Sequence, residues 1–199
     1  MLMRKILTIT LFLFIILKTF SQSKLRDSIY IETQIFTLVY SEKLEQPKWI
    51  EYVVECPNGN ASRKGMDFYT NDSIKTSDNQ DYVNNIWDKG HMAPAADFNC
   101  TKEMLKMTFS YLNCVLQNQD LNRTTWRLLE EHERTLALKY DVTVEIRCVF
   151  SKKSVVLPSG ATIPDGFYKI INYDGKKETY YFKNEKPLTT DYKKFLITQ

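Results

Sequence analysis

Residues 87–98 read WDKGHMAPAADF and contain His91, one of only two histidines in the chain. Gly90 allows the backbone to turn sharply beside the imidazole, and Pro94 prevents a helix from forming around it. Lys89 and His91 are two positions apart, so they lie on one face if the segment is extended. Lys89 can hold a charged oxygen while His91, whose unperturbed pKa is about 6.5, accepts a proton. This pair therefore suits an anionic substrate.

Residues 121–138, LNRTTWRLLEEHERTLAL, are rich in Leu, Glu and Arg and contain no Gly or Pro, which predicts one long helix. Asn122, Glu130 and Arg134 lie within about 120° of one another on a regular helix. The amide oxygen of Asn122 suits Mg²⁺, which keeps several waters and takes other ligands from a substrate phosphate. Glu130 could accept hydrogen bonds from those waters, and Arg134 could neutralise transition-state charge. The alternative is an amphipathic helix with an ordinary Glu130–Arg134 pair and a solvated His132.

Short runs of β-branched and aromatic residues surround these two segments and predict strands separated by turns. The expected strands cover residues 35–40, 49–54, 107–116, 142–150, 167–173 and 178–182. The last two form a hairpin around Asp174-Gly175, and a short helix is expected after Lys186. A length of 199 residues with no internal repeat suits a single domain. We therefore expect one α+β domain built on an antiparallel sheet, with one long central helix.

The N-terminus has the pattern of an export signal. Arg4 and Lys5 precede an apolar run at residues 6–17, ILTITLFLFIIL, which is too short to span a bilayer. The sequence predicts a signal peptide at residues 1–21 with cleavage after Ser21, leaving a mature domain of residues 22–199. The expected location is secreted or periplasmic, with no stable membrane association after cleavage. An uncleaved membrane anchor is the alternative.

Net charge gives no reason to expect a polyanionic partner. The formal charge is +3, from 27 basic and 24 acidic residues. Three of the bases (Arg4, Lys5 and Lys18) lie in the predicted signal peptide, so the mature chain would hold 24 of each sign. Hydrophobic residues at 43% and aromatic residues at 13% supply a core and exclude wholesale disorder. Any affinity for nucleic acid must come from where a few charges lie.

The four cysteines, Cys56, Cys100, Cys114 and Cys148, lack the CxxC spacing of a structural zinc site. In an oxidising compartment an even number suggests two disulfides, with three possible connectivities. The short separation favours Cys100–Cys114, and free buried thiols are the alternative.

Taken together, these segments resemble the DNA/RNA non-specific endonucleases, which have the ββα-metal (His-Me finger) core. The order and spacing of the motifs agree with that family, and looser similarity extends from residue 47 to about residue 184. The matching residues are Asp88-Lys89-Gly90-His91, Thr108-Phe109, Asn113, Gln117, Leu121-Asn122, Trp126, Leu129-Glu130 and Arg134.

The resemblance implies that His91 is the general base and that Asn122 is the direct protein ligand of Mg²⁺, with Mn²⁺ as a second candidate ion. The reaction would be hydrolysis of phosphodiester bonds in DNA and RNA, leaving a 5′-phosphate and a 3′-hydroxyl. Little sequence specificity is expected, because the contacts would be to phosphate, metal and sugar. The other implied site residues are Glu130, which would orient metal-bound water, Arg134 and Lys89, which would contact phosphate, and Asn113, which would support the site.

One departure from the family motif motivates an alternative function. Lys89 stands where the family usually has arginine, so the bidentate fork is lost while the charge is kept. A catalytically weak or inactive nucleic-acid-binding relative of the same fold is therefore the alternative to an active enzyme. A structural domain that carries the motif by accident is a third reading.

Overall fold

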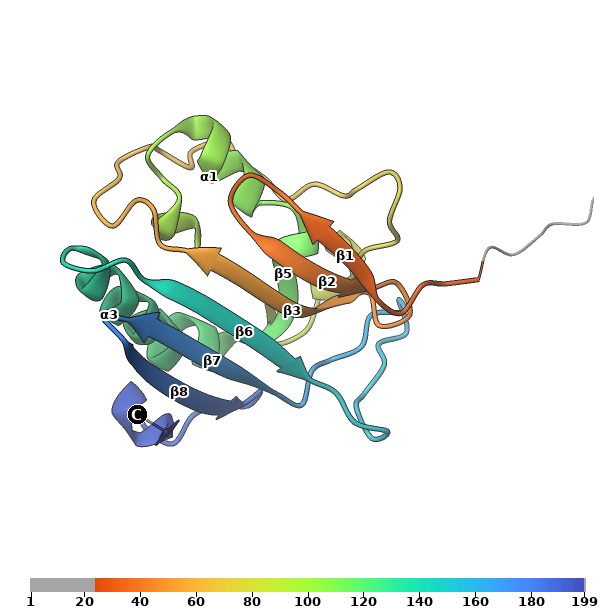
Figure 1. Ribbon diagram of the computed structural model, residues 1–199. Helices are drawn as coiled ribbons and strands as arrows, with labels where there is room; N and C mark the ends of the chain where they lie inside the picture. The colour runs from red at the N-terminus through yellow and green to blue at the C-terminus, as the bar shows by residue number, and fades with distance from the viewer. Residues whose placement is uncertain (1–23, 199) are drawn as a thin grey trace, which may run out of the picture.

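Seven antiparallel strands form the main sheet, in the order β1-β2-β3-β6-β7-β8-β9 (Figure 1). The computed structural model describes residues 24–198, so the predicted signal peptide at residues 1–21 lies outside the described residues. The strands are β1 Ile29–Glu32, β2 Thr37–Ser41, β3 Gln46–Val53, β6 Thr143–Val149, β7 Gly166–Tyr173, β8 Lys176–Lys183 and β9 Leu196–Thr198. Within residues 24–198, none of the helices combines the length and the apolar character needed to cross a bilayer.

The hairpin of β7 and β8 confirms the predicted turn. Asp174 and Gly175 both have positive φ, at 48° and 70°. Two successive residues with positive φ suit the right-handed twist of a two-residue hairpin, and Asp-Gly is a preferred pair for it.

A second, two-stranded sheet and the helix after it form a ββα unit. The antiparallel strands are β4 Trp87–His91 and β5 Cys114–Asn118, with His91 opposite Cys114. The predicted long helix follows directly, as α2 Gln119–Leu121, a π-helical stretch η4 Asn122–Trp126 and α3 Arg127–Ala137. The expected α+β fold with an antiparallel sheet and one long helix is therefore confirmed.

The long helix is held against the main sheet by aromatic packing. Trp126 is buried, and its ring lies edge-on to Phe167 of β7 at 5.5 Å and to Phe182 of β8 at 5.6 Å. Leu129, one turn further on, is also fully buried. One face of the helix thus enters the core, and a neighbouring face lines the cleft described below.

The strand predicted at residues 107–116 is largely wrong. Residues Lys102–Thr108 form helix α1, residues Tyr111–Asn113 form a 3-10 turn, η3, and only the end of the run enters β5. Thr101 caps α1, because its hydroxyl accepts a hydrogen bond of 3.2 Å from the backbone N–H of Met104. A short apolar run does not distinguish a buried helix from a buried strand. The remaining short elements are the 3-10 turns η1 Asn79–Tyr82, η2 Ala95–Asp97 and η5 Tyr192–Phe195, the last in place of the helix expected after Lys186.

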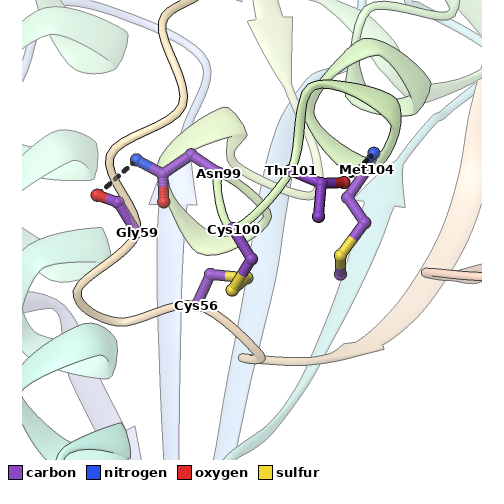
Figure 2. The surroundings of a disulfide bond; sticks show 6 residues. All are labelled: Cys56, Gly59, Asn99, Cys100, Thr101 and Met104. Carbon is purple, nitrogen blue, oxygen red and sulfur yellow. Dashed lines mark hydrogen bonds between the residues drawn. A yellow bond between two sulfur atoms is a disulfide. The ribbon is translucent and has the colours of Figure 1, made fainter.

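The disulfide joins Cys56 to Cys100, and the predicted Cys100–Cys114 pair is wrong (Figure 2). Helix α1 and η3 lie between Cys100 and Cys114, and Cys114 enters β5, where its thiol donates to the hydroxyl of Tyr82. Cys114 and Cys148 are free thiols among the described residues, so only one of two expected disulfides is present. The bond ties the segment after β3 to the segment between η2 and α1.

Candidate active site

A cleft of about 670 Å³ lies beside the ββα unit and brings together four of the six predicted site residues. His91 enters it from the end of β4, and Asn122, Glu130 and Arg134 enter it from the helix. The structure thus brings these four predicted residues together in one cleft.

The π-helical stretch explains why Asn122 shares the cleft with Glu130. On a regular α-helix, residues eight positions apart differ in direction by about 80°. A π turn closes with i→i+5 hydrogen bonds and takes more residues per turn, so each residue advances by a smaller angle. The π-helical residues Asn122–Trp126 therefore rotate Asn122 back toward the face of Glu130. Nothing in the 3.6-residue pattern indicates this irregularity.

The amide of Asn122 is oriented by an acidic residue on β4. Its Nδ2 donates a hydrogen bond of 2.9 Å to Oδ2 of Asp88. The same carboxylate accepts two bonds from Arg123, of 2.8 Å from Nε and 2.6 Å from Nη2. With the nitrogen of Asn122 held in this way, its oxygen Oδ1 is the end that can ligate a cation.

His91 is half-buried between two aromatic rings. The centroids of Phe68 and Phe109 lie 4.9 Å and 5.1 Å from its ring. Its Nε2 atom is buried and accepts or donates no hydrogen bond within residues 24–198. Burial, together with the charge of Arg63, lowers the pKa of His91 from 6.5 to about 4. The imidazole is therefore neutral at pH 7 and able to take a proton.

Gly90 serves a different purpose from the one predicted. The backbone does not turn there, because Gly90 lies inside β4 opposite Val115. A Cβ at Gly90 would lie 2.4 Å from Oε1 and 2.6 Å from Cβ of Gln117. The absence of a side chain lets the buried Gln117 pack directly on the strand beside His91.

Asn113 is fully buried and fixes the chain that follows His91. Its Oδ1 accepts a bond of 2.7 Å from the N–H of Ala93, and its Nδ2 donates to the carbonyls of Ala93 and Thr108 at 2.9 Å each. This position is compatible with the predicted supporting role.

Lys89 does not line the cleft, although the prediction placed it on substrate phosphate. Its ammonium group donates to Oδ1 of Asn79 and lies 3.9 Å from Asp67. It also lies 5.2 Å and 5.4 Å from the ring centroids of Phe68 and Tyr111. These amide, carboxylate and aromatic partners hold the charge outside the cleft.

Three arginines that line the cleft are missing from the sequence-based prediction: Arg63, Arg123 and Arg127. Arg123 and Arg127 are four positions apart on the same helix as Asn122, a spacing that could have indicated them. Arg63 lies in the irregular loop after β3, where no periodicity exists to place it.

The Glu130–Arg134 ion pair of the alternative reading is not formed, and Arg134 pairs with a different carboxylate. Nη1 of Arg134 donates a bond of 2.8 Å to Oδ1 of Asp97, which is fully buried in η2. Glu130 is half-buried in the wall of the cleft, and burial raises its pKa from 4.5 to about 7. His132 is not a solvated residue as expected, because its Nε2 lies 3.0 Å from Glu178 and its ring stacks on Tyr192.

The described residues contain no cluster of three or more His, Cys, Asp or Glu side chains that could hold a metal ion. A cation here would therefore depend on Asn122 and on waters. Such a donor set fits Mg²⁺, which retains much of its hydration shell in proteins.

Comparison with known proteins gives a consistent match. The sequence model of the DNA/RNA non-specific endonuclease family matches residues 18–198. A crystal structure of the EndoG/EndoGI complex is similar with a TM-score of 0.77 and 26% identity, over 85% of this chain and 80% of that one. Nuclease EXOG of Danio rerio is 32% identical over 117 residues, and endonuclease G of Bos taurus is 28% identical over 110 residues.

These alignments cover 55% and 53% of this chain but only 34% and 37% of the two relatives. The match thus spans about a third of the length of these curated relatives. Both relatives are named as mitochondrial nucleases, which contradicts the secreted or periplasmic location predicted from residues 1–21.

Proposed function

The chain belongs to the DNA/RNA non-specific endonuclease family, and we propose on this premise that it is a divalent-metal-dependent endonuclease. It would hydrolyse phosphodiester bonds of DNA and RNA with little sequence specificity. The observation that carries this proposal is the convergence of His91, Asn122, Glu130 and Arg134 on one cleft.

His91 would act as the general base. Its imidazole is neutral at pH 7, and its Nε2 makes no hydrogen bond within the described residues. Nε2 is buried, so a water molecule in the cleft would instead lose a proton to the other ring nitrogen, Nδ1, as its oxygen attacks phosphorus. The bond from phosphorus to the 3′ oxygen would then break, leaving a 3′-hydroxyl and a 5′-phosphate.

Asn122 would hold the cation through Oδ1, since Asp88 occupies its Nδ2. Glu130 lines the same cleft and would accept hydrogen bonds from the waters of the ion. When bound, Mg²⁺ or Mn²⁺ would stabilise the negative charge that develops on the phosphate.

Phosphate recognition would come from the arginines of the cleft. Arg63, Arg123, Arg127 and Arg134 all line it, whereas Lys89 is held elsewhere by Asn79. Contacts of guanidinium groups to phosphate position a nucleic acid and carry no base information. This arrangement supports cleavage with little dependence on sequence.

Cleavage of a supercoiled plasmid tests the proposal. The protein is expected to nick the plasmid with Mg²⁺ and to stop in EDTA, and His91→Ala should lose activity by at least about a hundredfold. His132→Ala is the matched control, because the second histidine lies outside this cleft and contacts Glu178 instead. Equal cleavage by His91→Ala and the wild type would disprove the assignment of the base.

The same samples test the alternative function. An inactive nucleic-acid-binding relative would retard labelled DNA in a salt-sensitive manner without nicking the plasmid in Mg²⁺ or in Mn²⁺. The placement of Lys89 among Asn79, Phe68 and Tyr111 is the observation that favours this alternative.

A further inference from the structure

Behind the cleft lies a group of charged side chains that no predicted role uses. Asp97 in η2, Glu133 in α3 and Lys169 in β7 are all completely buried. They lie next to Glu130 and Arg134 of the cleft, and the ammonium group of Lys169 lies 4.7 Å above the ring of Trp126. We call these five charged residues, Asp97, Glu130, Glu133, Arg134 and Lys169, the buried ionic cluster.

The hydrogen bonds of the cluster use only one oxygen of each buried carboxyl group. Oδ1 of Asp97 accepts from Arg134 at 2.8 Å. Oε1 of Glu133 accepts from Lys169 at 3.0 Å and from the hydroxyl of Tyr52 at 3.2 Å. Lys169 is also 3.0 Å from Oε2 of Glu133, but it is not directed at that atom for a hydrogen bond.

Two buried oxygens are left over, Oδ2 of Asp97 and Oε2 of Glu133. Neither oxygen accepts a hydrogen bond from an N–H or O–H donor among residues 24–198. The carboxyl groups of Asp97 and Glu133 lie within hydrogen-bonding reach of each other. Two adjacent buried carboxylates cannot both be ionised without a large cost. A single proton between the two oxygens would satisfy both at once.

The charges of the cluster favour the same arrangement. Three carboxyl groups face two cations, so one negative charge would be left in excess if all were ionised. Burial raises the pKa of Asp97 against the opposing effect of Arg134. Burial also raises the pKa of Glu133 well above its usual value, against Lys169 and with a further contribution from Asp97 and Glu130.

We propose that Asp97 and Glu133 share one proton, as a carboxylic acid hydrogen-bonded to a carboxylate, and that this proton keeps the positive charge of Arg134 available to the cleft. If both groups were ionised, Arg134 and Lys169 would face a full carboxylate each, and the positive potential that Arg134 contributes to the cleft would be cancelled. Asp97 and Glu133 are therefore positioning residues that act through Arg134. This second half of the inference rests on the proposed function, whereas the shared proton does not.

Infrared spectroscopy of the full chain tests the shared proton directly. The C=O stretch of a protonated carboxyl group is well separated from that of a carboxylate and shifts in D₂O. The spectrum is recorded at about pH 8.5, where Glu130, with its pKa of about 7, is ionised. The wild type is expected to show one protonated-carboxyl band. Absence of this band from the wild type would overturn the proposal.

Variants assign the band. Glu133→Gln and Asp97→Asn should each abolish it, because an amide N–H takes the place of the shared proton. Two independent variants keep the assignment testable if one of them fails to fold. Glu178→Gln is the matched control, since burial of Glu178 is outweighed by hydrogen bonds from Tyr180, Tyr173 and His132, which lower its pKa. A band lost in Glu178→Gln and kept in Glu133→Gln would contradict the proposal.

Binding of a labelled oligonucleotide in EDTA tests the effect on Arg134 separately from catalysis. The affinity of the wild type for the oligonucleotide should fall by about tenfold as alkaline pH removes the shared proton. This fall adds to any pH dependence of binding that the wild type and Glu133→Gln have in common. Glu133→Gln cannot lose that proton and should lack this alkaline step. Identical pH profiles would overturn the role through Arg134. A protein that binds in this way without nicking plasmid would contradict the proposed function alone.

Discussion

Nδ2 of Asn122 donates a hydrogen bond of 2.9 Å to Oδ2 of Asp88, a residue 34 positions earlier in β4. The strand thus determines which end of the Asn122 amide faces the cleft. Asp88→Ala should lower plasmid cleavage by about 10- to 100-fold, because the amide is freed to rotate and Arg123 loses its partner. The thermal unfolding temperature should change little, since Arg123 is exposed and surface ion pairs contribute little stability.

Asp88→Asn is the graded control for this variant. Its amide oxygen can still accept from Asn122, so it should retain more activity than Asp88→Ala. Full activity in Asp88→Ala would show that orientation by Asp88 is unimportant.

Protonation of His91 should lower the stability of the folded protein at acidic pH. Its folded-state pKa of about 4 is below the ordinary value of 6.5, so the unfolded chain binds more protons between those values. The contribution of the neutral His91 side chain to the free energy of unfolding is complete above pH 6.5. It is lost on acidification toward pH 4, by up to about 3 kcal/mol. Urea unfolding of the wild type and His91→Ala across this range should show a weaker loss in the variant. Parallel curves would contradict the lowered pKa.

In the metal-free protein, the contribution of Glu130 to folding stability should depend on pH in the opposite direction. Its folded-state pKa of about 7 is above 4.5, so the folded chain binds more protons between those values. Its contribution is complete below pH 4.5 and is lost as pH rises to 7, by up to about 3 kcal/mol. In EDTA, Glu130→Gln should therefore lose more stability than the wild type on acidification from pH 6.5 to 4.5. A smaller loss of stability in Glu130→Gln than in the wild type would contradict the raised pKa of Glu130.

The π-helical stretch predicts how the protein responds when one residue is deleted or inserted within it. Deleting Thr124 leaves Asn122 and Glu130 seven positions apart, which on a regular α-helix still places them about 20° apart. The deletion variant should keep plasmid cleavage within about tenfold of the wild type. Inserting one alanine after Thr124 rotates Asn122 by about 100° and should abolish cleavage. Circular dichroism checks that both variants remain folded. An active insertion variant would contradict the role assigned to this stretch.

Much of the site follows from spacing within single elements. Asn122, Glu130 and Arg134 occupy one helix, and His91 lies at the end of β4, in a segment where Pro94 indicates that no helix forms. These residues could be predicted because a helix or strand fixes the directions of its own side chains. The angular mismatch between Asn122 and Glu130 is corrected by the π turn, which the pattern does not reveal.

The parts that could not be predicted depend on contacts between distant segments. Lys89 carries the expected charge, yet Asn79 and the ring of Tyr111 draw it away from the cleft. Arg63 reaches the cleft from an irregular loop, and Arg134 forms an ion pair with Asp97 of a distant segment. Packing and local charge balance determine which of these side chains contact one another, and a periodic sequence pattern shows neither.

The Cys56–Cys100 bond makes residues 56–100 a closed covalent ring that carries Arg63, Asp88 and His91. At the neck of the ring, Asn99 donates a bond of 3.0 Å to the carbonyl of Gly59, where a Cβ would collide with the Asn99 side chain (Figure 2). A protease that cuts once inside this ring would leave two fragments still joined through sulfur. If the cut lies between Cys56 and His91, reduction would then separate the fragment that carries His91 from the fragment that carries the end of β3.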